Sequence, residues 1–323
     1  MKAIILCAGK GKRLKPFTFS IPKHLLTIGN KTVLSYLLDD IIKYKIKSVG
    51  LVVNRETKNI FEEYLEKNRY SNSLDFTFII QEKSNGLADA CYSAKNFIGQ
   101  DDFLMFLGDN LIPDGLKEMY NENNLDSDSM ILVSEVTDPR PFGVVELDSN
   151  GSVSNLVEKP ENPKSNLIIV GIYYFKPTIF NAIENIKPSL RGELEITDAI
   201  KYLLMDNKKV KAIKYKGTFI DIGNFNNLLT ANTFVLDNII KNKTRISDSA
   251  IIENSKILDH VSIGNNSTIR NSIIENSIIM EDTIVEDAYI KDSVVGNRCR
   301  IYGNNQELHI NIYAGDNTNI RLF

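Results

Sequence analysis

The stretch KAIILCAGKGKRLKPFTFSIPKH, residues 2–24, decides the fold of the amino-terminal part of this chain. Its first seven residues form an apolar run that is typical of a buried β-strand. Two glycines, two prolines and six basic residues follow within residues 6–24, so the strand leads directly into a positively charged loop. Prolines fix the backbone of such a loop, and N–H groups in glycine-rich turns can cradle phosphates. We therefore predict a site for a phosphate-rich ligand directly after the first strand.

The glycine spacing of this loop excludes two common phosphate-binding motifs. Gly9 and Gly11 would be the first two glycines of G-x-G-x-x-G, but Leu14 stands at the third. A Walker loop would need glycine at Leu6 and serine or threonine at Arg13. The alternative to a phosphate site is a basic loop that is merely solvated.

Strand and helix patterns alternate after the first strand. Residues 32–44 repeat apolar side chains along one helical face. Further strand patterns are SVGLVV (48–53), DFTFII (75–80) and DFLMFL (102–107), and further helical patterns are NIFEEYLEKN (59–68) and GLADACYSAKNFI (86–98). This alternation predicts an α/β fold, Rossmann-like, with a mainly parallel sheet. Ligands of such folds bind beyond the carboxyl ends of the strands.

Charge and cysteine content limit the functional classes. The 323 residues include 38 basic and 41 acidic side chains, which gives a formal net charge of −3 and no reason to expect nucleic acid or an anionic membrane as a partner. No apolar run approaches the roughly 18 residues of a membrane span, and the first apolar stretch is too short for a signal peptide. Cys7, Cys91 and Cys299 lack C-x-x-C spacing, which argues against disulfides and structural zinc and predicts a reducing, cytoplasmic setting.

The periodicity changes towards the carboxyl end. NFNNLLTANTFVLDNII (224–240) is a helical pattern, and beyond it apolar residues recur at intervals of five or six. These positions are Ile251, Ile257, Ile263, Ile269, Ile274, Ile279, Ile284, Ile290, Val295 and Ile301. Serine stands two places before six of them, at Ser249, Ser255, Ser267, Ser272, Ser277 and Ser293. This pattern predicts a hexapeptide-repeat, left-handed parallel β-helix of about three turns, closed by YAGDNTNIRLF (313–323).

The change of period divides the chain. We predict one domain over residues 1–240 and a short β-helix domain over residues 241–323. The faces and open strand edges of a short β-helix need covering, which predicts a homo-oligomer.

Motifs in the first domain resemble those of a known family. AGKGKRLKPFTFSIPKHLL (8–26) is similar to the G-x-G-x-R-L-x-P-x-T-x-x-x-P-K signature of the sugar-1-phosphate nucleotidylyltransferases. Matching segments follow in the family's order: QEKSNGLADA (81–90), FLGDNLI (106–112), FGVVELDSNGSVSNLVEKP (142–160), VGIYYF (170–175), RGELEITDAI (191–200) and FIDIGN (219–224). With its repeats, the chain looks most like the long, β-helix-bearing glucose-1-phosphate thymidylyltransferases.

The resemblance implies a reaction and its substrates. A nucleotidyl group passes from a nucleoside triphosphate to a sugar-1-phosphate, pyrophosphate is released and Mg²⁺ is the cofactor. The substrates implied above all others are dTTP and glucose-1-phosphate, which give dTDP-glucose. The sugar phosphate is already mostly ionised near neutral pH, because its second pKa is around 6, so no general base is required.

Charged residues in the matching segments suit two polyanionic substrates. Arg13 offers a fork of donors and Lys23 a point charge, so both suit the triphosphate and the leaving pyrophosphate. Asp109 follows a strand pattern at the predicted binding edge, where a carboxylate can hold Mg²⁺ or, alternatively, form a turn. The family resemblance favours the metal role for Asp109 and implies a second ligand at Asp221.

The resemblance also implies sugar and nucleotide contacts. Glu158 can accept hydrogen bonds from sugar hydroxyls and Lys159 can bind the sugar phosphate, although such a pair in isolation is usually solvated surface. The other sugar-side positions implied are Gly143, Val170, Gly171 and Glu193. The nucleotide-side positions implied are Leu6, Ala8, Gly9, Gly11, Gln81 and Gly86.

One substitution leaves the choice of nucleotide open. The thymidylyl branch usually has L-A-G-G where this chain has LCAG (6–9), so Ala8 leaves UTP as an alternative substrate. Uracil and thymine differ by one methyl group, and a difference of that size is worth only about 1–3 kcal/mol of discrimination. Dual use of dTTP and UTP is therefore also compatible with the sequence.

Two other functions are alternatives. A bifunctional enzyme would use the β-helix for acyl transfer, with His260 or His309 as the base. A regulatory subunit would keep the fold without catalysis. Loss of the basic and acidic residues assigned to phosphates and metal would favour a regulatory subunit, and Arg13, Lys23, Asp109 and Lys159 are all present.

Overall fold

The computed structural model describes residues 1–120 and 127–322, apart from the side chains of residues 305–307. Its contacts separate the chain into two compact units. Unit 1 comprises Met1–Gly9 and Leu37–Phe219, and unit 2 comprises Lys10–Tyr36 and Ile220–Phe323. The charged segment that follows the first strand, residues 10–32, therefore belongs to the same unit as the repeats. The domain boundary predicted between residues 240 and 241 stays a prediction.

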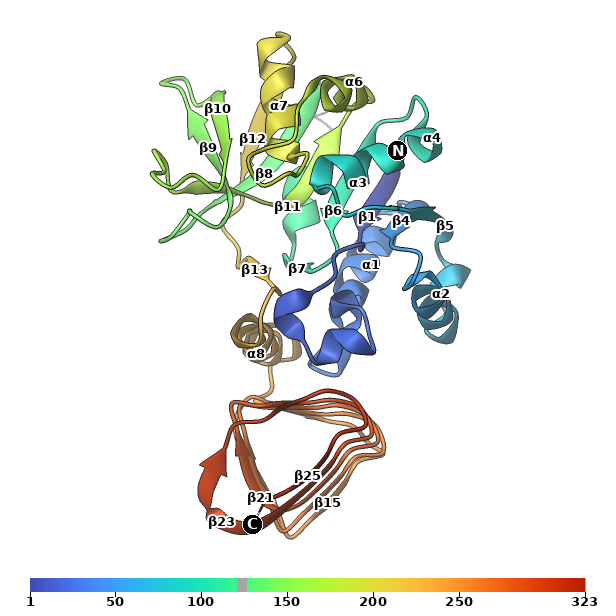
Figure 1. Cartoon of the computed structure of the whole chain (residues 1–323), viewed down its shortest axis with the longest axis vertical. Coiled ribbons are helices and arrows are strands. Elements are labelled where there is room, and N and C mark those ends of the chain that lie inside the picture. The colour runs from blue at the N-terminus through green and yellow to red at the C-terminus, as the bar shows by residue number, and fades with distance from the viewer. Residues whose placement is uncertain (121–126, 323) are drawn as a thin grey trace. The chain divides into compact units, whose positions relative to one another are not determined.

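Unit 1 is built on a nine-stranded sheet (Figure 1). Seven strands follow in the order β10-β9-β11-β6-β1-β4-β5, while β8 pairs with both β11 and β12. Their bounds are β1 Lys2–Leu6, β4 Ser48–Val53, β5 Asp75–Ile80, β6 Phe103–Leu107, β8 Ser129–Glu135, β9 Gly143–Leu147, β10 Val153–Glu158, β11 Leu167–Phe175 and β12 Val210–Lys214. Strands β1, β4, β5 and β6 are parallel, which confirms the parallel sheet predicted from their alternation with helices. Strand β11 runs antiparallel to β6, β8 and β9.

The carboxyl ends of β1, β4 and β6 lie together. Leu6 stands opposite Val52 of β4 and Leu107 of β6. The ladder continues one residue further, because Cys7 N–H donates to Val52 O at 2.7 Å and Gly108 N–H donates to Leu6 O at 3.1 Å. The segments after β1 and β6 therefore leave the sheet side by side, at the edge where ligands of parallel sheets bind.

Helices alternate with these strands. Their bounds are α1 Val33–Lys43, α2 Lys58–Lys67, α3 Leu87–Ser93, α4 Lys95–Ile98, α5 Gly115–Met119, α6 Thr178–Asn185 and α7 Ile196–Met205. The single helix predicted over residues 86–98 is wrong, since α3 and α4 are separated at Ala94. Ser93 Oγ donates to Asp89 O at 3.0 Å and Ala94 N–H donates to Cys91 O at 3.0 Å, so the last turn of α3 tightens. None of the helices in the described chain is long and apolar enough to cross a membrane.

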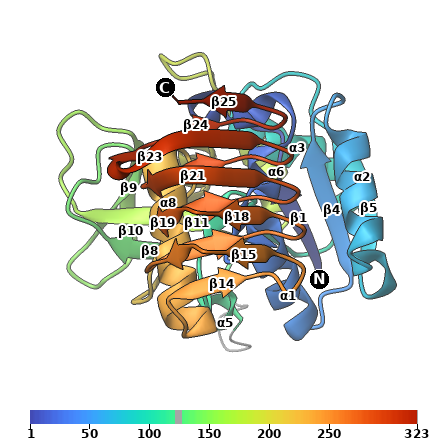
Figure 2. The same cartoon turned by 90° about the horizontal axis from the view of Figure 1, so that it is seen from below.

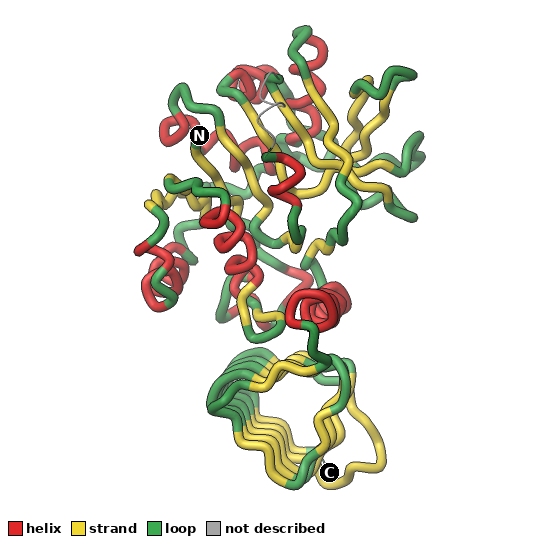
Figure 3. Tube along the Cα trace, turned by 180° about the vertical axis from the view of Figure 1, so that it is seen from behind, coloured by secondary structure: helices red, strands yellow, loops and turns green. Residues whose placement is uncertain are grey.

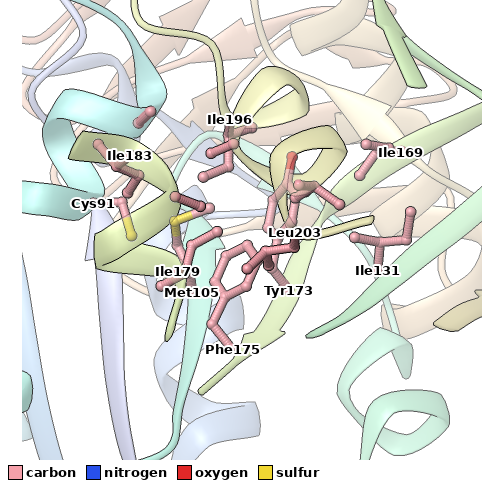
Figure 4. Packing of buried hydrophobic residues seen from close by; sticks show 14 of the residues in the cluster. Cys91, Met105, Ile131, Ile169, Tyr173, Phe175, Ile179, Ile183, Ile196 and Leu203 are labelled. Carbon is pink, nitrogen blue, oxygen red and sulfur yellow. The ribbon is translucent and has the colours of Figure 1, made fainter. Parts of the chain in front are cut away.

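One buried cluster fixes the helices that carry site residues (Figure 4). Cys91 of α3, Ile183 of α6 and Leu203 of α7 belong to the same cluster as Met105 of β6 and Phe175 of β11. All five are at most 4% exposed. Burial of each large apolar side chain contributes about 1.5–3 kcal/mol, so α3 and α7 are held firmly on the sheet.

The charged segment of unit 2 is folded but has little regular structure. Its elements are three short 3-10 turns, η1 Lys12–Leu14, η2 Phe17–Phe19 and η3 Lys23–Leu25, and a hairpin of β2 Thr27–Ile28 and β3 Lys31–Thr32. Leu14 and Phe17 are fully buried. The segment is therefore packed against its own unit, which argues against the alternative of a merely solvated loop. The later helical pattern of this unit forms α8 Phe225–Phe234 and a π-helix, η6 Val235–Ile240.

Unit 2 ends in a parallel β-helix, whose coils stack in register (Figure 2). Ile252, Ile269, Val285, Ile301 and Ile320 stand opposite one another in successive coils. The first column is β14 Thr244–Ile246, β17 Val261–Ile263, β20 Ile278–Ile279, β22 Val294–Val295 and β24 Tyr313–Ala314. The other columns are formed by β15 Ile251–Glu253, β16 Lys256–Ile257, β18 Thr268–Arg270, β19 Ile273–Glu275, β21 Ile284–Lys291, β23 Arg300–Ile310 and β25 Asn319–Arg321.

Two details predicted for the β-helix are wrong. The described part of the first column holds five strands, more than about three turns provide, because β14 precedes the predicted repeats and β24 follows them. Ile251 is 48% exposed and Ile284 is half-buried, whereas Ile252 and Val285 face the core. Each of the two misassigned isoleucines has a β-branched apolar neighbour, so spacing alone could not determine which of the pair faces inward.

Strands and loops alternate along each coil of the β-helix (Figure 3), and small polar side chains connect successive coils. Thr283 N–H donates to Ser267 Oγ at 3.2 Å, and Cys299 N–H donates to Thr283 Oγ1 at 3.1 Å. All three side chains are fully buried. The regular phase of small residues in the sequence is thus a ladder of side-chain to backbone hydrogen bonds, which satisfies buried N–H groups between coils.

Candidate active site

The nucleotide-side residues nearest the sheet lie at the end of β1. Leu6 is 6% exposed and Ala8 is 5% exposed, whereas Gly9 is exposed. The chain therefore emerges from the sheet at Gly9. A backbone without a side chain at that point leaves its N–H group open to a ligand.

Gln81 and Gly86 are joined by a hydrogen bond in unit 1. Gln81 follows β5, and its Nε2 donates to Asp89 Oδ2 at 2.8 Å and to Gly86 O at 3.3 Å. Gly86 has φ +111°, and a Cβ there would overlap the carbonyl oxygen of Leu194. Ala88 N–H donates to that carbonyl at 3.0 Å. The backbone of Leu194 thus approaches Gly86 closely, and this contact joins the nucleotide-side segment to the sugar-side segment.

Asp109 follows β6 at the same edge of the sheet as Leu6. Asn110 Nδ2 donates to Asp109 Oδ1 at 3.2 Å. A Cβ on Gly171 would overlap Asn110 Oδ1, so glycine at that position makes room for the amide beside Asp109. Val170, predicted on the sugar side, is fully buried in β11.

Glu158 lies at the centre of the sugar-side residues. It ends β10, and its side chain is 18% exposed. Thr197 Oγ1 donates to Glu158 Oε2 at 3.1 Å, and Lys159 Nζ lies 3.6 Å from Glu158 Oε1. A Cβ on Gly143 would lie 2.6 Å from Thr197 Cγ2 and 3.2 Å from Glu158 Oε2. Gly143, Glu158 and Lys159, all predicted on the sugar side, therefore lie together with Thr197.

Arg191 is a charged residue that the sequence reasoning missed. Its Nη1 lies 3.6 Å from Glu158 Oε1 and 3.3 Å from Glu195 Oε1, and its Nη2 lies 3.0 Å from Glu193 Oε2. Burial raises the pKa of Glu195, and a hydrogen bond from Ser189 Oγ at 2.8 Å opposes that rise. The signal was available in RGELEITD, where an arginine starts the segment that holds Glu193.

Arg13 and Asp221 meet at Gly223 in unit 2. A Cβ on Gly223 would lie 2.6 Å from Arg13 Nη2 and 3.2 Å from Asp221 Oδ2. The backbone of this turn is fixed by Asn227, whose Nδ2 donates to Asp221 O at 2.6 Å. Glycine at 223 therefore leaves the space in which the guanidinium and the carboxylate lie.

Lys23 lies beside the first turn of the charged segment. Gly11 has φ +58°, and a Cβ there would lie 3.4 Å from Lys23 Cβ and 2.7 Å from Thr18 Cγ2. Thr18 Oγ1 donates to Gly11 O at 3.0 Å. The left-handed backbone at Gly11 folds the segment back on itself, so that residues twelve apart in sequence come into contact.

The carboxylates of Asp109 and Asp221 suit Mg²⁺ chemically. Magnesium is held by one or two carboxylates and completes its shell with water and phosphate oxygens. Asp109 is oriented by Asn110 and Asp221 lies against Gly223, so each carboxylate is held in place within its own unit. Within the described residues no group of three or more His, Cys, Asp or Glu side chains forms a metal cluster. Each carboxylate suits an ion that phosphates help to bind.

The two histidines considered for acyl transfer have different surroundings. His260 Nε2 lies 3.3 Å from Asp237 Oδ1 and 3.3 Å from Lys243 Nζ. His309 is exposed, and its ring packs edge-on against Tyr289 at 5.8 Å.

Comparison with known proteins defines the class. A family model described as nucleotidyl transferase matches residues 2–238. The chain therefore belongs to the nucleotidyl transferase family. Its relatives identify it as an enzyme of the sugar-1-phosphate nucleotidylyltransferase kind.

Individual relatives have several names. A glucose-1-phosphate thymidylyltransferase of Streptomyces antibioticus is 36% identical over 99% of this chain and 90% of its own length. A bifunctional protein GlmU of Methanococcus aeolicus is 40% identical over 80% of this chain, which spans 60% of that longer relative. A solved UDP-glucose pyrophosphorylase complexed with UDP-glucose matches 72% of this chain and 96% of its own, with a TM-score of 0.63 and 26% identity.

Proposed function

We propose that this chain transfers the thymidylyl group of dTTP to glucose-1-phosphate, which gives dTDP-glucose and pyrophosphate. The observation that carries the proposal is the similarity to the Streptomyces antibioticus thymidylyltransferase over 99% of the chain, repeats included. A phosphate oxygen of the sugar-1-phosphate attacks the α-phosphorus of the triphosphate. The bond from that phosphorus to the bridging oxygen breaks, and the electron pair leaves with pyrophosphate.

The triphosphate is assigned to residues at the end of β1 and in the charged segment. Arg13 and Lys23 neutralise the phosphates and the charge that develops on the leaving pyrophosphate. Backbone N–H groups at Gly9 and Gly11 approach the same phosphates. The base is assigned to Leu6, Ala8, Gln81 and Gly86.

The sugar phosphate is assigned to the residues around Glu158. Glu158 accepts hydrogen bonds from sugar hydroxyls, and its orientation is supported by the hydrogen bond from Thr197. Lys159 and Arg191 supply positive charge for the phosphate of this substrate. Gly143, Val170 and Glu193 complete the proposed sugar side. Two cations near one carboxylate suit a ligand that carries both hydroxyls and a dianionic phosphate.

Mg²⁺ is assigned to Asp109 and Asp221. When bound, such an ion neutralises phosphate charge as a Lewis acid. Asp109 and Asp221 would supply its protein ligands, and phosphate oxygens and water the rest.

UTP is the second candidate nucleotide. Ala8 in place of the glycine usual for the thymidylyl branch and the similarity to a UDP-glucose pyrophosphorylase both favour it. Acyl transfer by the β-helix has less support, because His260 and His309 lie in unlike surroundings and neither has a second feature that indicates an acyl carrier. We also infer a cytoplasmic homo-oligomer, from three buried cysteines that form no disulfide among the described residues and from a β-helix whose strand edges need covering.

Pyrophosphate release tests the proposal directly. Purified full-length protein with Mg²⁺ is assayed against ATP, CTP, GTP, UTP and dTTP, each with a panel of sugar-1-phosphates. We expect release that requires both substrates, with dTTP and glucose-1-phosphate the most efficient pair. A higher kcat/KM with UTP would replace the thymidylyl proposal by the uridylyl one. If the folded protein releases no pyrophosphate with any pair, the result would support the regulatory-subunit alternative instead.

A further inference from the structure

The charged segment of unit 2 ends in a hairpin whose turn is attached to the β-helix. Gly29 and Asn30 form a two-residue turn between β2 and β3, with φ +58° and +61°, which is the type I′ geometry. Asn30 Nδ2 donates to Ile263 O at 2.7 Å and to Arg245 O at 3.1 Å. Both carbonyls belong to the first column of the β-helix, on strands β17 and β14.

A buried asparagine on α8 strengthens this attachment. Asn232 has no exposed surface. Its Oδ1 accepts hydrogen bonds from Gly29 N–H at 2.8 Å and from Ser262 Oγ at 2.7 Å, and its Nδ2 donates to His260 O at 3.1 Å. One amide therefore joins the hairpin turn to two residues of the β-helix. A buried amide with three partners has a single orientation, because any other leaves polar atoms unsatisfied.

A second attachment lies at the other end of the stack. The buried ring of Phe17 packs edge-on against Phe225 at 5.5 Å, and Phe225 stacks on Tyr313 of β24 at 4.5 Å. A Cβ on Gly315 would lie 3.1 Å from Pro16 Cβ. The same segment is thus attached to early coils through Asn30 and to the last coil through the aromatic stack.

These attachments lie close in sequence to the residues assigned to the triphosphate. Along the chain, Lys23 lies between Phe17 and Asn30, and Arg13 lies three residues before Pro16. The segment has only short 3-10 turns and a small hairpin, so its own hydrogen bonds cannot fix its conformation. A stack of coils connected by buried hydrogen bonds is a rigid support by comparison.

We propose that the β-helix fixes the conformation of the triphosphate-binding segment, and that Asn30, Asn232 and Tyr313 are positioning residues for Arg13 and Lys23. This inference rests on the role proposed above for Arg13 and Lys23. It gives the repeats a function within the nucleotidyl transfer reaction, separate from acyl transfer and from oligomerisation.

Two substitutions test the two attachments separately. Asn30→Gly keeps the turn, because glycine adopts positive φ readily, but removes both hydrogen bonds to the β-helix. Tyr313→Ala removes the stack on Phe225, and Tyr313→Phe keeps it. Matched controls are Asn207→Gly, at an exposed asparagine with φ +56°, and Tyr302→Ala, on the neighbouring coil beside Arg321.

The readouts are hydrogen exchange of residues 10–23, nucleoside triphosphate affinity, sugar-1-phosphate affinity and kcat, all in the full-length protein. Each lost hydrogen bond or aromatic stack is worth roughly two- to tenfold in an equilibrium, so we expect about tenfold faster exchange and about tenfold weaker triphosphate binding in Asn30→Gly and Tyr313→Ala. Sugar-1-phosphate affinity should not change. Tyr313→Phe and both controls should behave as wild type.

The possible failures are distinguishable. If Asn30→Gly and Tyr313→Ala leave exchange and triphosphate affinity unchanged while Arg13→Ala loses turnover, the β-helix does not position the segment. If Arg13→Ala keeps wild-type turnover, the proposed role of the segment itself is wrong, whatever the exchange data show. A loss of sugar-1-phosphate affinity equal to that of triphosphate affinity would indicate general destabilisation and overturn the inference.

Discussion

The residues assigned to the two substrates are held in place by different means. Arg13 and Asp221 lie against a glycine in unit 2, and Asn110 beside Asp109 lies against another in unit 1. These groups occupy the space that a glycine leaves open because it has no side chain. The sugar-side residues Glu158 and Arg191 instead meet through ion pairs and a hydrogen bond to Thr197.

The two groups of residues should be sensitive to different kinds of substitution. An added methyl group at Gly223 or Gly171 must displace the side-chain end that lies against the glycine, Arg13 Nη2 or Asn110 Oδ1. An ion-paired group at a half-exposed site tolerates small changes of volume but depends on charge and on ionic strength. The two substrates should therefore respond to different substitutions.

The largest expected effect is the loss of turnover when the carboxylate of Asp109 in unit 1 is replaced. Asp109→Asn keeps the shape of the side chain but removes the charge that suits Mg²⁺, so we expect turnover to fall by about a thousandfold. Pyrophosphate release at saturating Mg²⁺ measures this effect, with Asp206→Asn at an exposed helix end as the control. Near-wild-type turnover in a folded Asp109→Asn variant would disprove the metal assignment.

Gly86→Ala tests close packing by its effect on stability. The positive φ and the overlap of a new Cβ with the Leu194 carbonyl should together lower the free energy of unfolding by about 3 kcal/mol or more. Denaturant unfolding measures the loss. Gly151→Ala is the control, because Gly151 also has positive φ but no atom within 4 Å, and it should cost only about 1–2 kcal/mol. Equal losses would mean that backbone strain alone matters.

Gly223→Ala tests the packed group of unit 2 by its effect on activity. A methyl group there must displace the Arg13 guanidinium, so we expect kcat to fall by about a hundredfold, in the range seen when one transition-state donor is lost. The melting temperature and the KM for sugar-1-phosphate should change little. Gly99→Ala, where nothing lies within 4 Å, should keep wild-type kcat. An unchanged kcat in Gly223→Ala would show that the reaction does not depend on the position of Arg13 beside Gly223.

Arg191→Ala should have the smallest effect, and only on the sugar side. We expect the KM for sugar-1-phosphate to rise about tenfold, since a half-exposed cation contributes roughly 1–2 kcal/mol to a phosphate contact. Higher salt should reduce the difference from wild type. Arg140→Ala removes an exposed arginine that is paired with Asp138, and it should leave KM unchanged. An equal rise in the KM for triphosphate would contradict the expectation that the two substrates respond to different substitutions.

Much of the fold could be predicted from the sequence because its signals are local. Apolar runs such as AIIL and FLMFL indicate buried parallel strands, and the serine and isoleucine period indicates a β-helix. The phase of that period was uncertain at Ile251 and Ile284, where two apolar residues adjoin. The break between α3 and α4 was missed because the hydrogen bond from Ser93 to the backbone competes with the helix without changing its apolar pattern.

The candidate site was predictable where one segment carries several charged residues, and less so where distant segments meet. Arg191 was missed because an arginine before glycine is unremarkable until the fold brings Glu158 beside it. The role of Gly223 was also invisible in the sequence. Its significance comes from Arg13, which lies 210 residues earlier in the chain.

The sequence by itself determined the alternating α/β pattern and the repeat architecture, because each depends on residue types at short, regular spacing, and the resemblance of its motifs to a known family implied the class of reaction. Only the tertiary structure decided that the charged segment joins the unit of the β-helix and that Asn30, Asn232 and Tyr313 hold it there. Such contacts depend on hydrogen bonds and ring stacking between residues that are far apart in the chain. No local pattern encodes them, since the chain must fold before the partners meet.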